Sequence, residues 1–114
     1  MTLTALFMTL CAVTSLDCEK VNVEYVEFSD ARLGAATLYT SGNSAIFISK
    51  TLEGGRNAPI KKIMIHELSH LVTYRNALAR GDNPIGKHNT EYKKVCRTLA
   101  KINGLSTKLC KSHE

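Results

Sequence analysis

Aromatic side chains are scarce in this sequence, and tryptophan is missing altogether. The 114 residues include only three Phe and four Tyr. Proteins that hold single-stranded nucleic acids usually stack the bases on exposed aromatic rings. The composition therefore disfavours a stacking platform for single strands.

Cysteine is also sparse, and the four cysteines form no recognisable motif: Cys11, Cys18, Cys96 and Cys110. No two of them have the Cys-x-x-Cys spacing of redox or zinc sites. Small secreted domains that depend on disulfides are normally denser in cysteine. The sequence therefore predicts reduced, largely buried thiols in a cytoplasmic protein, and no ligand spacing supports an accessory metal site at Cys96 and Cys110.

Long hydrophobic runs are missing too. The first 18 residues, MTLTALFMTLCAVTSLDC, are apolar but too short to cross a membrane, and no Lys or Arg precedes Lys20. Apolar residues recur there at helical spacing: Leu3, Leu6, Phe7, Leu10 and Val13. We expect an amphipathic helix packed on the domain, with a cleaved leader as the alternative, and no membrane partner.

Positive charge exceeds negative charge by five, and much of the excess lies late in the chain. The basic residues there are Lys87, Lys93, Lys94, Arg97, Lys101, Lys108 and Lys111. Such a cluster attracts phosphates, but here it is not interleaved with aromatic residues. We interpret it as a solvated helix face and predict that DNA binding is weak and salt-sensitive at most.

The rest of the sequence predicts one α+β domain. Residues 20–28, 35–40 and 45–50 have the pattern of strands, and the last two are joined by the hairpin-like sequence SGNS. Helical periodicity runs from Ile60 to about Leu78 and again through Ile102, with the loop 80–89 between them. We expect a single domain over residues 1–114, with its core at about 3–103 and a tail at 104–114.

The central helix carries the sequence His66-Glu67-Leu68-Ser69-His70. Residues four apart lie on the same face of a helix, so His66 and His70 can present two imidazoles to one metal ion. Glu67 lies about 100° round the helix, beside such an ion, where it can take a proton from water. Burying three such groups in a purely structural helix would be costly. The spacing therefore predicts a catalytic zinc site.

A catalytic zinc needs a third protein ligand and an open position. His88 follows the turn after the central helix, and Glu91 lies one helical turn later. Both residue types bind zinc; we favour His88 and keep Glu91 as the alternative ligand or as an orienting carboxylate. His113 is expected to be a surface residue.

The segment MIHELSHLVTYRNALARGDNPIGKHNTEYKKVC resembles the SprT-like (Spartan-type) zinc metallopeptidases. Their active helix carries HExxH, and the following loop supplies a third histidine in a pattern like HGxxF. His88 begins the corresponding stretch, with Asn89 in place of the glycine and Tyr92 in place of the phenylalanine. The resemblance covers about residues 3–103 and is specific only in the metal motif. It indicates a minimal, zincin-like version of the domain without an appended zinc ribbon.

The resemblance implies one catalytic zinc ion ligated by His66, His70 and His88, with Glu67 as general base. It also implies hydrolysis of peptide bonds in a protein or peptide substrate, and we expect a monomer. The alternative is a zinc-stabilised binding module with a DNA-associated or inhibitory role and little turnover. Retention of Glu67 favours catalysis, because folding around zinc requires only the histidines. A deformylase-like activity is disfavoured, because no matching cysteine ligand precedes His66.

Two further predictions concern the substrate. An extended peptide is held best by an open strand edge, and the strand that leads into the active helix offers Ile46 to Ser49. Tyr74 and Lys87 are the nearest polar groups that can stabilise an oxyanion.

Overall fold

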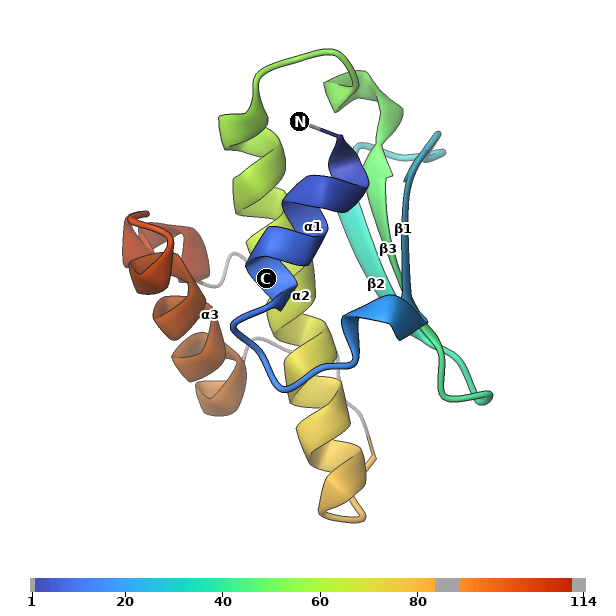
Figure 1. Cartoon of the computed structure of the whole chain (residues 1–114), viewed down its shortest axis with the longest axis vertical. Helices are drawn as coiled ribbons and strands as arrows, with labels where there is room; N and C mark the ends of the chain where they lie inside the picture. Colours follow the sequence, from blue (N-terminus) through green and yellow to red (C-terminus); the bar gives the residue numbers. More distant parts are fainter. Residues whose placement is uncertain (1, 84–88, 112–114) are drawn as a thin grey trace.

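The computed structural model describes residues 2–83 and 89–111 of the chain. Its helices and strands are α1 (Leu3–Cys11), β1 (Val21–Val26), β2 (Gly34–Leu38), β3 (Ser44–Ser49), α2 (Asn57–Ala79) and α3 (Thr90–Ile102). Three short 3-10 helices complete it: η1 (Cys18–Lys20), η2 (Lys50–Leu52) and η3 (Thr107–Cys110). The predicted α+β class and the order of the main elements are confirmed (Figure 1).

The strand order is β1-β3-β2, with β1 parallel and β2 antiparallel to β3. The prediction that Ile46 to Ser49 form an open edge is therefore wrong, because β3 is the central strand. Residues on both of its faces are nearly inaccessible, with Ala45 at 1% exposure and Ile46 at 0%. The hairpin supplies β2 as one neighbour of β3, and β1 is the other. Among the described residues, the outer strands β1 and β2 each have one edge without a partner strand, and β2 is the one that lies against α2.

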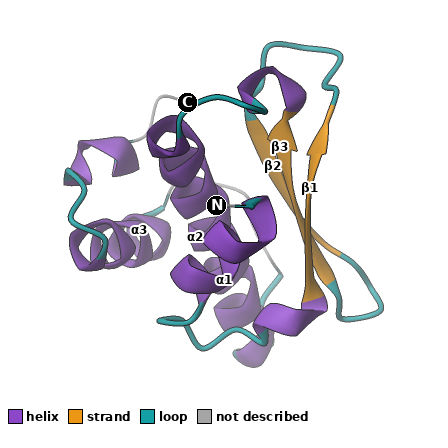
Figure 2. Ribbon diagram, turned by 45° about the horizontal axis from the view of Figure 1, so that its top comes forward, coloured by secondary structure: helices purple, strands orange, loops and turns teal. Residues whose placement is uncertain are grey.

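All three α-helices lie on one side of the sheet (Figure 2). Helix α2 runs between the sheet and α3, and α1 crosses in front of it (Figure 1). The core lies where these elements meet and includes Phe7, Leu10, Ile46, Ile48, Met64, Ile65, Leu68, Leu71 and Leu99. Burial of Leu6, Phe7 and Leu10 confirms the predicted packed amphipathic helix at the N-terminus. Val13 lies beyond the end of that helix and is 51% exposed.

The cysteines form two disulfides, Cys11–Cys18 and Cys96–Cys110. The prediction of reduced thiols is therefore wrong. The chain turns back after α1 and again at Gly104, whose positive φ of 68° suits glycine, so residues 7 and 14 positions apart meet. The segment predicted as a tail is consequently part of the fold as far as Cys110, which is 2% exposed.

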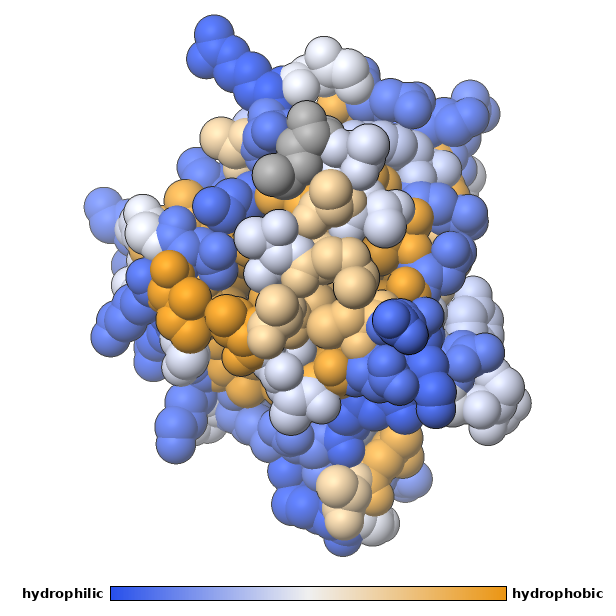
Figure 3. Space-filling view, in the orientation of Figure 1, coloured by the Kyte–Doolittle hydropathy of each residue, from blue (hydrophilic) through white to orange (hydrophobic). Residues whose placement is uncertain are grey.

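Hydrophobic side chains gather at the centre of the face in Figure 3, over α1, with hydrophilic side chains around them. Met8 on the outer side of α1 is 39% exposed. None of the helices within residues 2–83 and 89–111 combines the length and the apolar character needed to cross a bilayer.

Candidate metal centre

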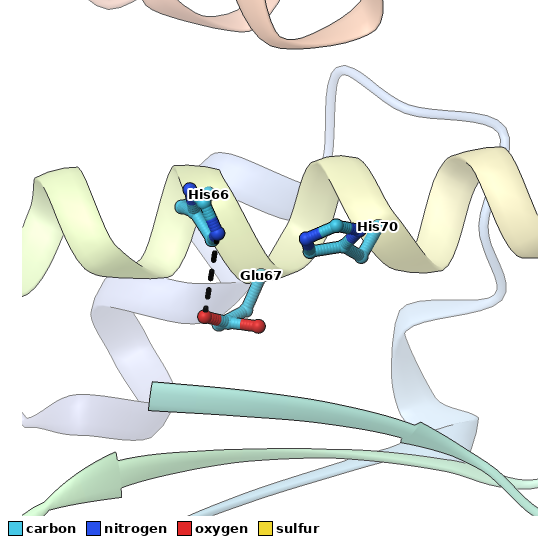
Figure 4. Close-up of side chains that lie close together, drawn as sticks. All are labelled: His66, Glu67 and His70. Atoms are coloured by element: carbon cyan, nitrogen blue, oxygen red, sulfur yellow. Dashed lines mark ion pairs between the residues drawn. The ribbon is translucent and has the colours of Figure 1, made fainter. Parts of the chain in front are cut away.

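The middle of α2 brings His66, Glu67 and His70 together (Figure 4). One ligand atom from each residue lies within 4.8 Å of the others, and the two imidazole centroids are 5.0 Å apart. The geometry follows from the helix itself, since residues four apart stack on one face. The three side chains form a group that can hold a metal ion.

The group is buried on one side and open on the other. Glu67 is 7% exposed and His70 is 6% exposed, whereas the His66 side chain keeps 32% of its surface accessible. The Oε2 atom of Glu67 lies 4.0 Å from Nε2 of His66. A carboxylate at this place is beside the metal position and within reach of a water molecule that enters past His66.

Tyr92 of α3 fixes the orientation of the His66 ring. Its hydroxyl lies 2.9 Å from Nδ1 of His66 and 3.3 Å from the His66 backbone carbonyl. The hydroxyl donates to the carbonyl, and in its contact with Nδ1 either atom can be the donor, depending on the imidazole tautomer. The other ring nitrogen, Nε2, lies on the side of Glu67. Metal-binding histidines commonly have a partner of this kind on the other ring nitrogen.

From the sequence, Tyr92 was considered only as the replacement of the phenylalanine in the HGxxF-like pattern. In the structure Tyr92 is 0% exposed, and its ring centroid lies 4.4 Å from that of His70. What was missed is the hydroxyl. A buried tyrosine normally needs a hydrogen-bond partner, and its place in the motif could have pointed to His66.

The third ligand was predicted to be His88, which lies outside the described residues, as does His113. The alternative, Glu91, is held elsewhere: both of its carboxylate oxygens accept hydrogen bonds from Arg80, at 2.9 and 3.2 Å. Asn89, which follows His88, caps α3 because its side chain accepts a hydrogen bond from the Tyr92 amide. The described contacts therefore favour an ion-pairing role for Glu91.

A cleft of about 370 Å³ adjoins the group. It is lined by Leu33, Gly34, Lys62, Ile63, His66, Glu67 and Leu109. The strand β2 approaches α2 closely here, because a Cβ on Gly34 would lie 2.7 Å from Cγ2 of Ile63 and 3.0 Å from Oε2 of Glu67. Gly34 is thus a site residue that the sequence analysis did not identify. A cavity of about 700 Å³ between α2, α3 and the segment after α1 contains none of the three metal-site residues.

Besides Lys62 in the cleft lining, Arg32 and Tyr74 also lie near the site. Hydrogen bonding to Asp30 is the main cause that raises the pKa of Arg32 above its ordinary value, and the negative charge of Glu67 adds to it. The Tyr74 ring, one of the predicted oxyanion groups, stacks on His70 with centroids 5.8 Å apart. Lys87, the other, lies outside the described residues.

Comparison with known proteins finds no family model that matches this chain and no curated protein that matches it. The resemblance to the SprT-like peptidases therefore stays a prediction. The argument for function rests on the site itself.

Proposed function

We propose that this chain is a zinc-dependent endopeptidase with Glu67 as its general base. The observation that carries the proposal is the convergence of His66, Glu67 and His70 within 4.8 Å at the side of a cleft. Convergent polar groups beside a cleft are the default candidate for a functional site.

The donor set fits zinc. Two neutral imidazoles from one helix are typical zinc ligands, and because Tyr92 contacts Nδ1 of His66, Nε2 is the nitrogen that would bind the ion. His66 and His70 would hold the ion, with His88 as the proposed third ligand. A zinc ion, when bound, supplies Lewis-acid polarisation of the scissile carbonyl and lowers the pKa of a neighbouring water molecule.

Glu67 performs the proton transfers. Its carboxylate accepts a proton from the attacking water and then donates that proton to the leaving amine nitrogen as the C–N bond breaks. Burial of Glu67 against β2 keeps the carboxylate in place between His66 and Gly34. General base catalysis of this kind contributes typically about 10²- to 10⁴-fold to the rate.

The open edge of β2 is the proposed substrate track. Leu33 accepts a hydrogen bond from Ser49, and Tyr39 donates one to Asn43, so odd-numbered residues of β2 face β3. In an antiparallel ladder the alternate residues face the other way. The backbone groups of Gly34 and Ala36 therefore point to the open edge, where an extended peptide can pair beside Glu67.

The two disulfides argue against the cytoplasmic location predicted from the sequence. Disulfides persist in oxidising environments and are rare in the cytosol. We place the active protein in an oxidising compartment. A protein substrate outside the cytosol fits this location better than a DNA-linked one.

The test compares the wild type with Glu67→Gln. β-Casein serves as an unfolded substrate, and zinc content and folding are measured on the same samples. Glu67→Gln removes the base but no proposed ligand, so we expect about one zinc per chain and a loss of hydrolysis of about 10² or more. Undiminished cleavage by the variant would reject the mechanism. Failure of the zinc-loaded wild type to cleave casein would favour the alternative of a binding module.

A further inference from the structure

Three apolar side chains from three separate parts of the chain meet beside the candidate metal centre. Leu33 precedes β2, Ile63 lies one turn before Glu67 on α2, and Leu109 comes from η3 near the C-terminus. All three line the cleft that also contains His66 and Glu67. Because the three residues come from distant segments, the apolar patch is formed by the tertiary fold and not by one helix face alone.

Leu109 lies next to a cysteine of the second disulfide. The adjacent Cys110 is bonded to Cys96 of α3, and Cys96 is 0% exposed. The start of η3 is fixed by Ser106, whose hydroxyl accepts a hydrogen bond from the Lys108 amide. Helix η3 contacts α3 and α2 but is only four residues long. The disulfide therefore ties the residue next to Leu109 to α3, in addition to the packing of Leu109 against the core.

The cleft also adjoins the proposed peptide track, because Gly34 is the first residue of β2 and Leu33 directly precedes it. Side chains of an extended peptide alternate between two sides. A substrate side chain next to the scissile bond would then lie in the space between Leu33, Ile63 and Leu109.

We propose that Leu109, positioned by the Cys96–Cys110 disulfide, closes an apolar subsite that selects a bulky hydrophobic residue next to the scissile bond. This inference rests on the proposed peptidase function. It assigns the second disulfide a role in substrate selection and the C-terminal segment a place in the site.

The first experiment uses Leu109→Ala. Binding of acetyl-leucine hydroxamate and acetyl-glycine hydroxamate to the zinc-loaded protein is measured by calorimetry, and cleavage sites in β-casein are mapped by mass spectrometry. We expect the wild type to prefer the leucine compound by about tenfold or more, as apolar pockets do for added methylenes. The variant should keep its zinc and lose most of that preference. An unchanged preference in Leu109→Ala overturns the proposal.

The second experiment compares two disulfide deletions. Cys96→Ala/Cys110→Ala should lose the leucine preference, whereas Cys11→Ala/Cys18→Ala, which removes the disulfide distant from the cleft, should retain it. Equal losses in the two double variants would reduce the effect to general destabilisation and overturn the role of the Cys96–Cys110 bond.

The two proposals fail in different ways. A leucine preference that depends on Leu109, without casein cleavage, leaves the subsite standing and removes the peptidase function. Casein cleavage that depends on Glu67, without any apolar preference at the cleaved bonds, supports the peptidase function and removes the subsite. Absence of both zinc and hydroxamate binding overturns both.

Discussion

Helices α2 and α3 lie side by side in the core, yet they bury different chemistry. The residues that α2 buries include four with polar side chains: Glu67, Ser69, His70 and Thr73. Those that α3 buries are Tyr92, Cys96, Leu99 and Ala100. In α3 the buried face follows the packing pattern of an ordinary amphipathic helix. The buried face of α2 departs from that pattern, because it also contains polar and ionisable side chains. These residues mark the candidate metal site.

The polar residues of α2 are themselves of two kinds. The hydroxyls of Ser69 and Thr73 donate to the carbonyls of Ile65 and Ser69 on their own helix, each at 2.7 Å, so their burial costs little. Glu67 instead carries a carboxyl group, which is rarely buried unless it is paired or hydrogen-bonded. Its burial beside two imidazoles fits the proposed metal site. Helix α3 contributes one polar group to this region, the Tyr92 hydroxyl.

The largest expected effect separates these two kinds of buried residue. His70→Ala should reduce zinc from about one ion per chain to nearly none, because a catalytic site has only three protein ligands. Ser69→Ala, one residue earlier and equally buried, should keep its zinc. Elemental analysis of the two purified variants checks this. Equal zinc contents in the two variants would contradict the assignment of His70 as a zinc ligand.

The next effect concerns the strand that faces α2. Gly34→Ala should displace Glu67, because the new Cβ would lie 3.0 Å from its Oε2 atom and 2.7 Å from Ile63. A shift of about 1 Å in a catalytic group can cost about 10²-fold in rate, so we expect a fall in kcat of up to that size with zinc retained. Gly55→Ala, in the loop before α2, is the control. Normal turnover in Gly34→Ala would show that catalysis does not depend on the present position of Glu67.

A smaller effect tests the single polar contribution of α3. Tyr92→Phe keeps the ring but removes the hydroxyl that is hydrogen-bonded to Nδ1 of His66. Loss of such a partner typically costs about 10- to 100-fold in metal affinity, and we expect zinc affinity to fall by that amount. Tyr74→Phe, whose ring stacks on His70, should bind zinc nearly as the wild type does. Competition with a chelator measures both. Equal affinities in the two variants would limit Tyr92 to packing.

The smallest effect concerns the outer face of α3, where Lys94, Arg97 and Lys101 are exposed. We expect weak DNA binding that decreases as salt rises. Arg97→Ala should lower the salt dependence of binding by about one phosphate contact and leave zinc content and cleavage unchanged. Titration of a labelled duplex at several salt concentrations measures this. Tight binding that does not respond to salt would place a nucleic-acid site on this helix after all.

The parts that sequence alone predicted are those governed by local geometry. His66, Glu67 and His70 converge because helical spacing places them together. The packed N-terminal helix and the hairpin from β2 to β3 also follow from short-range patterns. The α+β class required no more than these elements in order.

The parts that sequence did not predict depend on contacts between distant residues. The parallel pairing of β1 with β3 put the central strand where an edge was expected. The Cys96–Cys110 bond needed the chain to return after Gly104, which periodicity does not reveal. The role of Tyr92 depends on how α3 is rotated against α2. Gly34 acquires its importance only from the approach of β2 to Glu67.

The central claim is that His66 and His70 hold a catalytic zinc ion. Its most direct test is zinc analysis together with X-ray absorption at the zinc edge, on the purified wild type and on His88→Ala. We predict about one zinc per wild-type chain, with imidazole nitrogen and oxygen neighbours at about 2.0–2.1 Å, and loss of tight zinc in His88→Ala. Sulfur neighbours at about 2.3 Å, or a wild-type protein that binds no zinc, would contradict the account.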